Sequence, residues 1–277
     1  MKKIVIVTGA SSGMGKEFAL QISADTDADE IWLIARRMDK LNELCGELAD
    51  LHSEGIAADG QRPIPRAVQL DIAGRNGAAG FAALLEAEKS ADEKSGGFTI
   101  ATLVNNAGFG TYGPFEETAV DRELDMIDLN CTALTALCGY ALPYMTAGSA
   151  IINTASLASF LPLGNFAVYG ATKAYVLSFT MALAAEVKDR GIKVCALCPG
   201  PVSTEFANVA SNGARREVKH GLSAEKVVSH CLTCVKKGRR TAIMAFKWKF
   251  KAAASRFVGR YTGAWFTFKY CKRPHNS

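Results

Sequence analysis

Tyr169 and Lys173 are four residues apart in the stretch YGATK, and Ser156 follows an apolar run over 150–155. Residues four apart on a helix share a face, so the phenol and the ammonium would lie about one turn from each other. A nearby positive charge favours the phenolate, and each pKa unit corresponds to about 1.36 kcal/mol. The pattern predicts a tyrosine acting as a general acid or base near neutral pH. Ser156, after a predicted buried strand, could hold a carbonyl oxygen. A solvated helix face would give the same Tyr-Lys spacing.

A glycine-rich turn near the start of the chain could hold a phosphate. The apolar run 4–7 predicts a buried parallel strand, and TGASSGMG follows it over 8–15, before a predicted helix at 16–24. Glycines let the backbone approach a phosphate, and the helix start offers free N–H groups and the positive end of its dipole. The turn therefore predicts a pyrophosphate site, and the alternative is a turn that binds nothing. The residues expected to form this site are Gly9, Ser11, Ser12, Gly13, Met14 and Gly15.

Two arginines end the next apolar run. The run 31–35 predicts a second strand, and Arg36 and Arg37 follow it directly. In dinucleotide-binding folds an acidic residue at this point binds the ribose 2′-hydroxyl, whereas arginine accommodates a 2′-phosphate. Because Ala35 stands where the acid is expected, the sequence favours NADP(H) over NAD(H). The alternative is that both arginines are solvated at the start of a helix over 38–51.

Apolar runs and helical stretches alternate along the rest of the chain. This alternation indicates βαβ units, hence an α/β protein with a Rossmann-like doubly wound parallel sheet in one three-layer α/β/α domain over 1–246. Ligands bind such sheets at the carboxyl ends of the strands, where Gly15, Arg36, Asp71 and Gly108 fall, and Asp71 could touch an adenine ring. The remaining expected strands are 67–72, 100–104, 150–155, 192–198 and 241–246, the remaining helices 78–89, 120–140 and 224–237, and the main loop 52–66.

Six motifs in register resemble the short-chain dehydrogenase/reductase family over about the first 210 residues. They are TGASSGMG at 8–15, Asp71, NNAG at 105–108, Asn130, Ser156 with YGATK, and PGPVST at 199–204. The resemblance implies an NADP(H) site, with Thr204 at the position that binds the nicotinamide carboxamide. The further coenzyme contacts that it implies are Asn105, Ala107, Gly108, Tyr169, Lys173, Pro199, Gly200 and Val202.

The resemblance also implies the catalytic roles. Tyr169 would protonate a carbonyl oxygen as hydride arrives from the nicotinamide, or act as the base in the reverse direction. Lys173 would lower the Tyr169 pKa and bind the nicotinamide ribose, Ser156 would orient the carbonyl, and Asn130 would hold a water of a proton relay. We therefore expect an NADP(H)-dependent carbonyl reductase or alcohol dehydrogenase. The alternative is a non-catalytic regulatory protein that binds NADP with the same fold, but such a sensor has no need of all four residues.

No charged residue occurs over 131–172, and apolar side chains gather in the loops expected around the site. Prolines, glycines and asparagines break this span, so it does not supply the roughly 20 continuous apolar residues of a transmembrane helix. We interpret it as core and site wall, and infer a hydrophobic substrate such as a ketone, a sterol or a 3-oxoacyl compound. Some of these side chains could simply pack a loop. The expected substrate contacts are Phe109, Tyr112, Leu157, Phe160 and Phe166.

Two CxxC pairs, Cys195 with Cys198 and Cys231 with Cys234, raise a metal-site hypothesis. The first pair lies on a predicted strand, where positions three apart point to opposite faces, and the second lies on a predicted helix. We therefore expect reduced thiols and no metal site. With no signal-peptide pattern at the start, this favours a cytoplasmic location.

The chain ends in a basic, aromatic extension over 247–277, after a segment, 205–223, that we expect to cover the substrate. From Lys226 onward there are 13 Lys or Arg and no Asp or Glu. The extension could lie on an anionic membrane surface, or pack its rings on the core or on a second subunit; packing is favoured, because one amphipathic segment binds membranes only marginally. We expect no nucleic-acid binding, and a homodimer formed through the helices that carry Asn130 and Tyr169.

Overall fold

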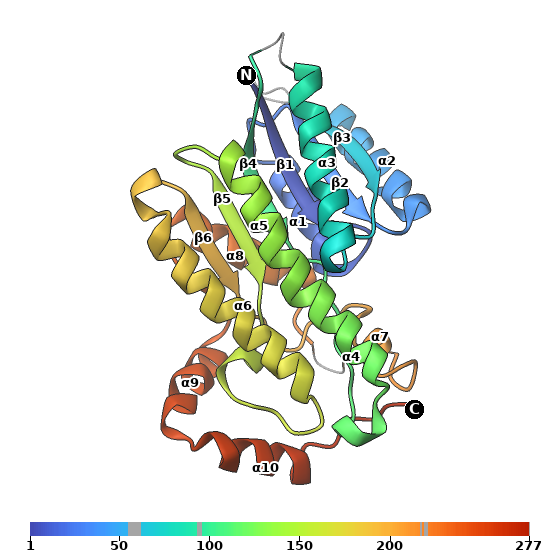
Figure 1. The fold of residues 1–277 in the computed structure, drawn as a ribbon, viewed down its shortest axis with the longest axis vertical. Coiled ribbons are helices and arrows are strands. Elements are labelled where there is room, and N and C mark those ends of the chain that lie inside the picture. Colours follow the sequence, from blue (N-terminus) through green and yellow to red (C-terminus); the bar gives the residue numbers. More distant parts are fainter. Residues whose placement is uncertain (55–61, 93–95, 217, 219–220, 277) are drawn as a thin grey trace.

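The computed structural model describes residues 1–54, 62–92, 96–216, 218 and 221–276. A seven-stranded sheet with the order β3-β2-β1-β4-β5-β6-β7 lies between two layers of helices (Figure 1). All six neighbouring strand pairs are parallel. The predicted fold class, a doubly wound parallel sheet, is confirmed. The strands are β1 (Lys2–Thr8), β2 (Glu30–Ala35), β3 (Ile64–Gln69), β4 (Phe98–Asn105), β5 (Ala150–Thr154), β6 (Lys193–Leu197) and β7 (Thr241–Ala242).

The helices bury one apolar side each against the sheet. Helices α1, α2 and α8 pack on one face, whereas α3, α5 and α6 pack on the other. Strand β1 alternates between these two cores, with Ile4 and Ile6 in one and Val5 and Val7 in the other, all fully buried. The helices are α1 (Gly13–Ser23), α2 (Met38–Glu54), α3 (Gly74–Asp92), α4 (Val120–Ile127), α5 (Leu134–Ala141), α6 (Ala167–Glu186), α7 (Phe206–Ala210), α8 (Ala224–Lys236), α9 (Phe246–Ala254) and α10 (Arg260–Tyr270).

The predicted element boundaries differ from the structure most clearly in three places. The expected helix over 120–140 is divided by a π-helical turn, Asp128–Ala133, between α4 and α5. Part of the expected loop 52–66 belongs to β3, an edge strand, which tolerates Pro65 because it needs no ladder partner on its outer side; residues 55–61 lie outside the described residues. The last strand ends at Ala242, and a helix begins at Phe246, inside the expected strand 241–246.

The extension after β7 folds back against the main domain. Helices α9 and α10 lie beside the carboxyl ends of the central strands, next to the loop between β5 and α6, and the carboxyl terminus comes close to the start of α4 (Figure 1). Within the described part of the chain, no helix has the length and hydropathy needed to cross a membrane.

Candidate active site

Ser156, Tyr169 and Lys173 meet at the carboxyl end of β5. Ser156 begins a 3₁₀ turn and its Oγ accepts a hydrogen bond from the Ala158 N–H (3.1 Å). Tyr169 and Lys173 occupy the first two turns of α6, with side chains that are 7% and 4% exposed. The Ser156 hydroxyl also lies close enough to the Tyr169 phenol to influence its pKa. The structure thus places a hydroxyl, a phenol and an amine together, as the spacing predicts.

The pKa values of this group differ from the prediction. Burial raises the pKa of Tyr169 to about 12, although the nearby Ser156 hydroxyl works in the opposite direction. Lys173 Nζ lies 5.8 Å from the centroid of the Tyr169 ring and donates a hydrogen bond to the Thr154 carbonyl oxygen (2.7 Å). Burial lowers the Lys173 pKa to about 8. In the protein without coenzyme, Lys173 therefore does not bring the Tyr169 pKa below its ordinary value, because the effect of burial on this pKa is larger.

Asn130 lies in the π-helical turn, and its side chain is fully engaged with protein groups. Its Nδ2 donates to the Phe109 carbonyl oxygen (2.9 Å) and to Thr172 Oγ1 (3.1 Å), while its Oδ1 accepts from the Phe109 N–H (3.1 Å). A π-helical turn interrupts the regular backbone ladder. Asn130 therefore fixes the loop after β4 against α6, next to Gly108, where an added Cβ would lie 2.7 Å from Asn130 Oδ1.

The turn between β1 and α1 has the close packing that a pyrophosphate site requires. Gly9 has a φ of +65°, and a Cβ at Gly15 would lie 2.0 Å from the Gly9 carbonyl oxygen, so neither tolerates a side chain. Ser11 and Ser12 directly precede α1, and Met14 lies in its first turn. The first N–H groups of a helix have no partner within it, so the start of α1 fits a bound phosphate.

The end of β4 is tied to this turn. Thr8 Oγ1 accepts hydrogen bonds from the N–H groups of Asn106 (3.0 Å) and Ala107 (3.1 Å). Asn105, however, is 3% exposed, and its amide donates to Asn153 Oδ1 (2.9 Å). Its side chain therefore belongs to the core, whereas Ala107 and Gly108 of this motif are only partly buried.

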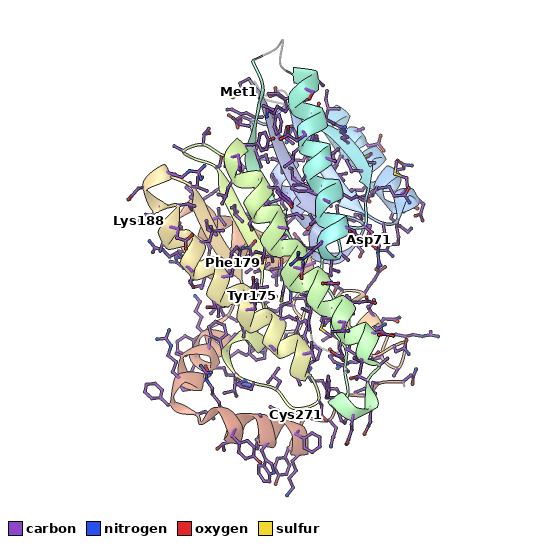
Figure 2. The ribbon with its side chains drawn as sticks, viewed as in Figure 1. Met1, Asp71, Tyr175, Phe179, Lys188 and Cys271 are labelled. Carbon is purple, nitrogen blue, oxygen red and sulfur yellow. The ribbon has the colours of Figure 1, made fainter. Side chains whose placement is uncertain are left out.

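The predicted phosphate-binding arginines lie at the end of β2. Arg36 is exposed, and its guanidinium is 4.0 Å from the Asp71 carboxylate, which is also exposed (labelled in Figure 2). Arg37 donates to Ser11 Oγ (3.1 Å) and pairs with Glu205 (3.1 Å). Arg37 therefore bridges the glycine-rich turn and the segment before α7, whereas Arg36 is the more open of the two.

The PGPVST segment closes the other side of the crevice. The Pro199 carbonyl oxygen accepts from the Leu157 N–H (3.0 Å), and Val202 forms a β-bridge with Leu222. A Cβ at Gly200 would lie 2.8 Å from Trp248 Nε1, a buried N–H without a hydrogen-bond partner. Thr204 contacts Gly13 across the crevice. These glycine contacts and the unpartnered N–H fit a dinucleotide lying along the strand ends.

The predicted substrate contacts divide into two groups. The Phe166 ring stacks on Tyr169 (4.1 Å between centroids), and Tyr112 meets Phe166 edge-on (4.8 Å). Phe109 packs at the margin of this cluster, and Leu157 lies next to Gly200. Phe160 instead packs against the core between the sheet and α6, away from this cluster. The wall beside Tyr169 is therefore aromatic, but Phe160 belongs to the core.

The cysteines occupy the positions that strand and helix geometry predict. Cys195 faces the core under α8, and Cys198 faces the opposite core, as expected for positions three apart on a strand. Among the residues whose placement is described, no group of three or more His, Cys, Asp or Glu side chains is arranged to hold a metal ion.

Sequence reasoning missed the residues that the extension contributes. Trp248 lies against Gly200, Arg273 Cζ lies over the rings of Tyr112 (5.1 Å) and Phe166 (4.5 Å), and His275 contacts Gly113. The basic, aromatic composition was the one signal of this segment. That composition indicates a segment that contacts a surface, but it does not show which of its residues lie at the site.

Comparison with known proteins agrees with this geometry. Residues 3–214 match the family model described as short chain dehydrogenase. Sulfoacetaldehyde reductase 2 of Chromohalobacter salexigens is 31% identical over 221 residues, 77% of this chain and 78% of that protein. A short-chain dehydrogenase from Sphingobium yanoikuyae, solved in complex with NADPH, has a TM-score of 0.74 and 26% identity over 92% of this chain and 94% of that one.

A second solved structure shows the fold over the whole length. A short-chain dehydrogenase/reductase from Burkholderia phymatum, in complex with NAD, has a TM-score of 0.75 and 20% identity, and the match covers 100% of this chain and 97% of that one. The family match spans both the glycine-rich turn and the Ser156, Tyr169 and Lys173 group. The chain has the α/β fold of an oxidoreductase with a nucleotide site, and it belongs to the short-chain dehydrogenase/reductase family.

Proposed function

We propose that this protein is an NADP(H)-dependent carbonyl reductase, or secondary alcohol dehydrogenase in reverse, acting on a substrate with a hydrophobic body. The observation that carries the proposal is the group of half-buried Ser156 with buried Tyr169 and Lys173, beside an aromatic wall at the sheet end. When bound, the nicotinamide supplies or accepts the hydride. Ser156 orients the carbonyl oxygen, and Tyr169 donates the proton to it.

Lys173 and Asn130 support this proton transfer in the proposal. In this proposal the Lys173 amine, whose pKa burial lowers, binds the nicotinamide ribose and, when protonated, favours the Tyr169 phenolate against the effect of burial. The Asn130 side chain already satisfies its partners, so we assign the relay water to the backbone carbonyls that the π-helical turn displaces from the regular ladder.

The test is turnover by the Tyr169→Phe variant. We expect the rate of NADPH oxidation with ketones, sterols and 3-oxoacyl thioesters to fall by about 10²- to 10⁴-fold, because the proton donor is lost. NADPH affinity, measured by fluorescence, should stay within a few-fold. Tyr144→Phe, which removes a phenol hydroxyl far from the site, is the matched control. Unchanged turnover in Tyr169→Phe would remove the proposed acid, and turnover absent from the wild type would favour the regulatory alternative.

The preference for NADP(H) is supported by Arg36, which is open to solvent at the end of β2, and by Ala35 in place of an acid. A cytoplasmic location is supported by the cysteines, all eight of which are free thiols, as expected in a reducing compartment.

We also propose a homodimer through α4 and α6. These helices pack together and expose Val120 (58%), Leu124 (54%) and Tyr175 (44%, labelled in Figure 2). A symmetric pairing would bury this apolar face. Analytical ultracentrifugation should show a dimer for the wild type and a monomer for Leu124→Lys. A monomeric wild type at micromolar concentration would rule the dimer out.

Finally, we propose that the extension contacts an anionic membrane surface. Phe246, Phe257 and Tyr261 are 82%, 92% and 82% exposed, although the other side of the extension packs on the domain. The segment 247–277 contains eight Lys or Arg and no acidic residue. A second copy docked on the same face would bring these like charges together. Anionic lipid headgroups match both the charge and the aromatic rings.

A further inference from the structure

The last residues of the chain bring a cation to the aromatic wall of the site. After α10 the chain runs without regular structure, and the Arg273 guanidinium lies over the rings of Tyr112 (5.1 Å) and Phe166 (4.5 Å). Phe166 stacks on the ring of Tyr169. The charge also acts on the proton donor itself, since Arg273 works against the rise of the Tyr169 pKa that burial causes.

This position is fixed by contacts on both sides of Arg273. His275 Nε2 lies 3.1 Å from a carboxylate oxygen of Glu117, and a Cβ at Gly113 would lie 2.9 Å from the His275 ring. The Asn276 N–H donates to the Ser211 carbonyl oxygen (3.1 Å), and its side-chain amide donates to the Asn212 carbonyl oxygen (2.9 Å). The tail therefore connects the turn before α4 to the end of α7, across the substrate side of the site.

Arg273 has no anionic partner in the part of the chain that the structure describes. Its Nε is buried without a hydrogen-bond partner, and the described residues place no carboxylate within 4.0 Å of its guanidinium. Arg37 and Arg66, by contrast, are paired, with Glu205 and with Glu88 respectively. A half-buried cation without a counter-charge is costly unless a ligand supplies one. A guanidinium stacked on rings keeps its N–H edge available for the two oxygens of a carboxylate.

We propose that Arg273 recognises an anionic group on the substrate, so that the preferred substrate carries a carboxylate or a similar oxyanion in addition to its carbonyl and apolar body. This inference rests on the proposed reductase activity, because it assigns the substrate class of the same site. The aromatic rings hold the apolar body, Tyr169 and Ser156 hold the carbonyl, and Arg273 holds the charged end. The tail is then a specificity element of the site.

The first experiment compares matched substrates. NADPH oxidation is followed with 4-oxo-4-phenylbutyrate and with its methyl ester, for the wild type, Arg273→Ala and Lys272→Ala. We expect the ratio of kcat/KM for the acid to that for the ester to fall by about 10- to 100-fold in Arg273→Ala, as for a lost charge-assisted hydrogen bond. Lys272→Ala removes the same charge one residue earlier and should leave the ratio unchanged. An unchanged ratio in Arg273→Ala, or a faster turnover of both substrates from an unblocked site, would overturn the proposal.

The second experiment needs no turnover. Calorimetric titration of the full chain with 4-phenylbutyrate and with the neutral 4-phenylbutyramide should show about tenfold tighter binding of the carboxylate, lost in Arg273→Ala and partly kept in Arg273→Lys, which retains the charge but not the fork. Equal binding of the two compounds, or binding of neither, would overturn the anion site. Carboxylate binding that depends on Arg273, in a wild type that reduces no carbonyl compound, would keep the anion site and refute the reductase.

Discussion

The group around Tyr169 and the C-terminal extension meet at the loop between β5 and α6. Polar side chains are buried in the first, whereas apolar side chains are exposed in the second. Around Tyr169 the protein buries an amine and a phenol, and the amine donates a hydrogen bond to the Thr154 carbonyl oxygen. In the extension it exposes large aromatic side chains beside lysines, and Figure 2 shows side chains of α10 projecting away from the domain. Burying polar groups costs free energy, so we expect it where catalysis requires it. We expect exposed aromatic rings where the protein binds a surface.

The difference should appear most strongly when the buried charge is removed. In Lys173→Met the donor to the Thr154 carbonyl is lost, and we expect turnover to fall on the order of 100-fold. Stability should respond to pH as well. Because burial lowers the Lys173 pKa from 10.5 to about 8, the unfolded state binds more protons at this group between these values. The stability of the wild type relative to Lys173→Met should therefore rise by roughly 2 kcal/mol from pH 8 to 9.5.

Urea unfolding of both proteins at pH 7.5, 8 and 9.5 measures this effect. Buried thiols such as Cys138 and Cys198, whose pKa values burial raises to about 12, act in the opposite direction over this range in both proteins, so the difference between the two profiles is the measured quantity. The range stops below pH 10 because the raised Tyr169 pKa also acts in the opposite direction above it. Parallel pH profiles for the wild type and Lys173→Met would show that the amine is not buried as described.

An exposed charge at the same site should matter less. Arg36 is 77% exposed at its side chain, so its contact with a 2′-phosphate would be partly screened by solvent. We expect Arg36→Ala to raise the KM for NADPH about 5- to 10-fold and to leave the KM for NADH nearly unchanged. Lys89→Ala, an exposed cation at the far end of α3, is the control. Equal losses for the two coenzymes would contradict the NADP(H) preference.

The extension should give the smallest effect, because its contact is with a fluid surface. We expect sedimentation with phosphatidylcholine vesicles that contain phosphatidylglycerol to fall a few-fold in the triple variant Phe250→Ser, Phe257→Ser, Phe266→Ser, and to weaken with salt. Leu51→Ser, an exposed apolar residue on α2, is the control. Binding that is the same with purely zwitterionic vesicles would argue against recognition of anionic lipid.

The parts of this protein that could be predicted are those that local sequence determines. Apolar runs such as 4–7 and 31–35 give buried parallel strands, and glycines that allow no Cβ mark the turn at Gly15. The Tyr169 and Lys173 spacing placed both on one helix face. The same kind of local pattern gave a wrong end for the last strand, because the stretch FKWKFKAAA forms a helix that begins at Phe246.

The parts that could not be predicted depend on contacts between distant segments. The Tyr169 pKa is set by burial under Phe166 and Tyr112, which no spacing reveals. Nothing in the sequence around Arg273 indicates that it returns to rings more than 100 residues earlier in the chain. The interruption of the helix at Asn130 likewise arises from its bonds to Phe109 and Thr172.

The contact between α10 and the loop before Tyr169 has a consequence for engineering. Asn165 has a left-handed backbone (φ 58°), and its amide donates to the carbonyl oxygens of Thr267 (3.2 Å) and Phe268 (2.9 Å), while a Cβ at Gly164 would lie 2.3 Å from the Phe268 side chain. The loop and α10 thus pack closely against each other at these residues. Grafting this extension onto another member of the family would require transplanting the Gly-Asn pair with it.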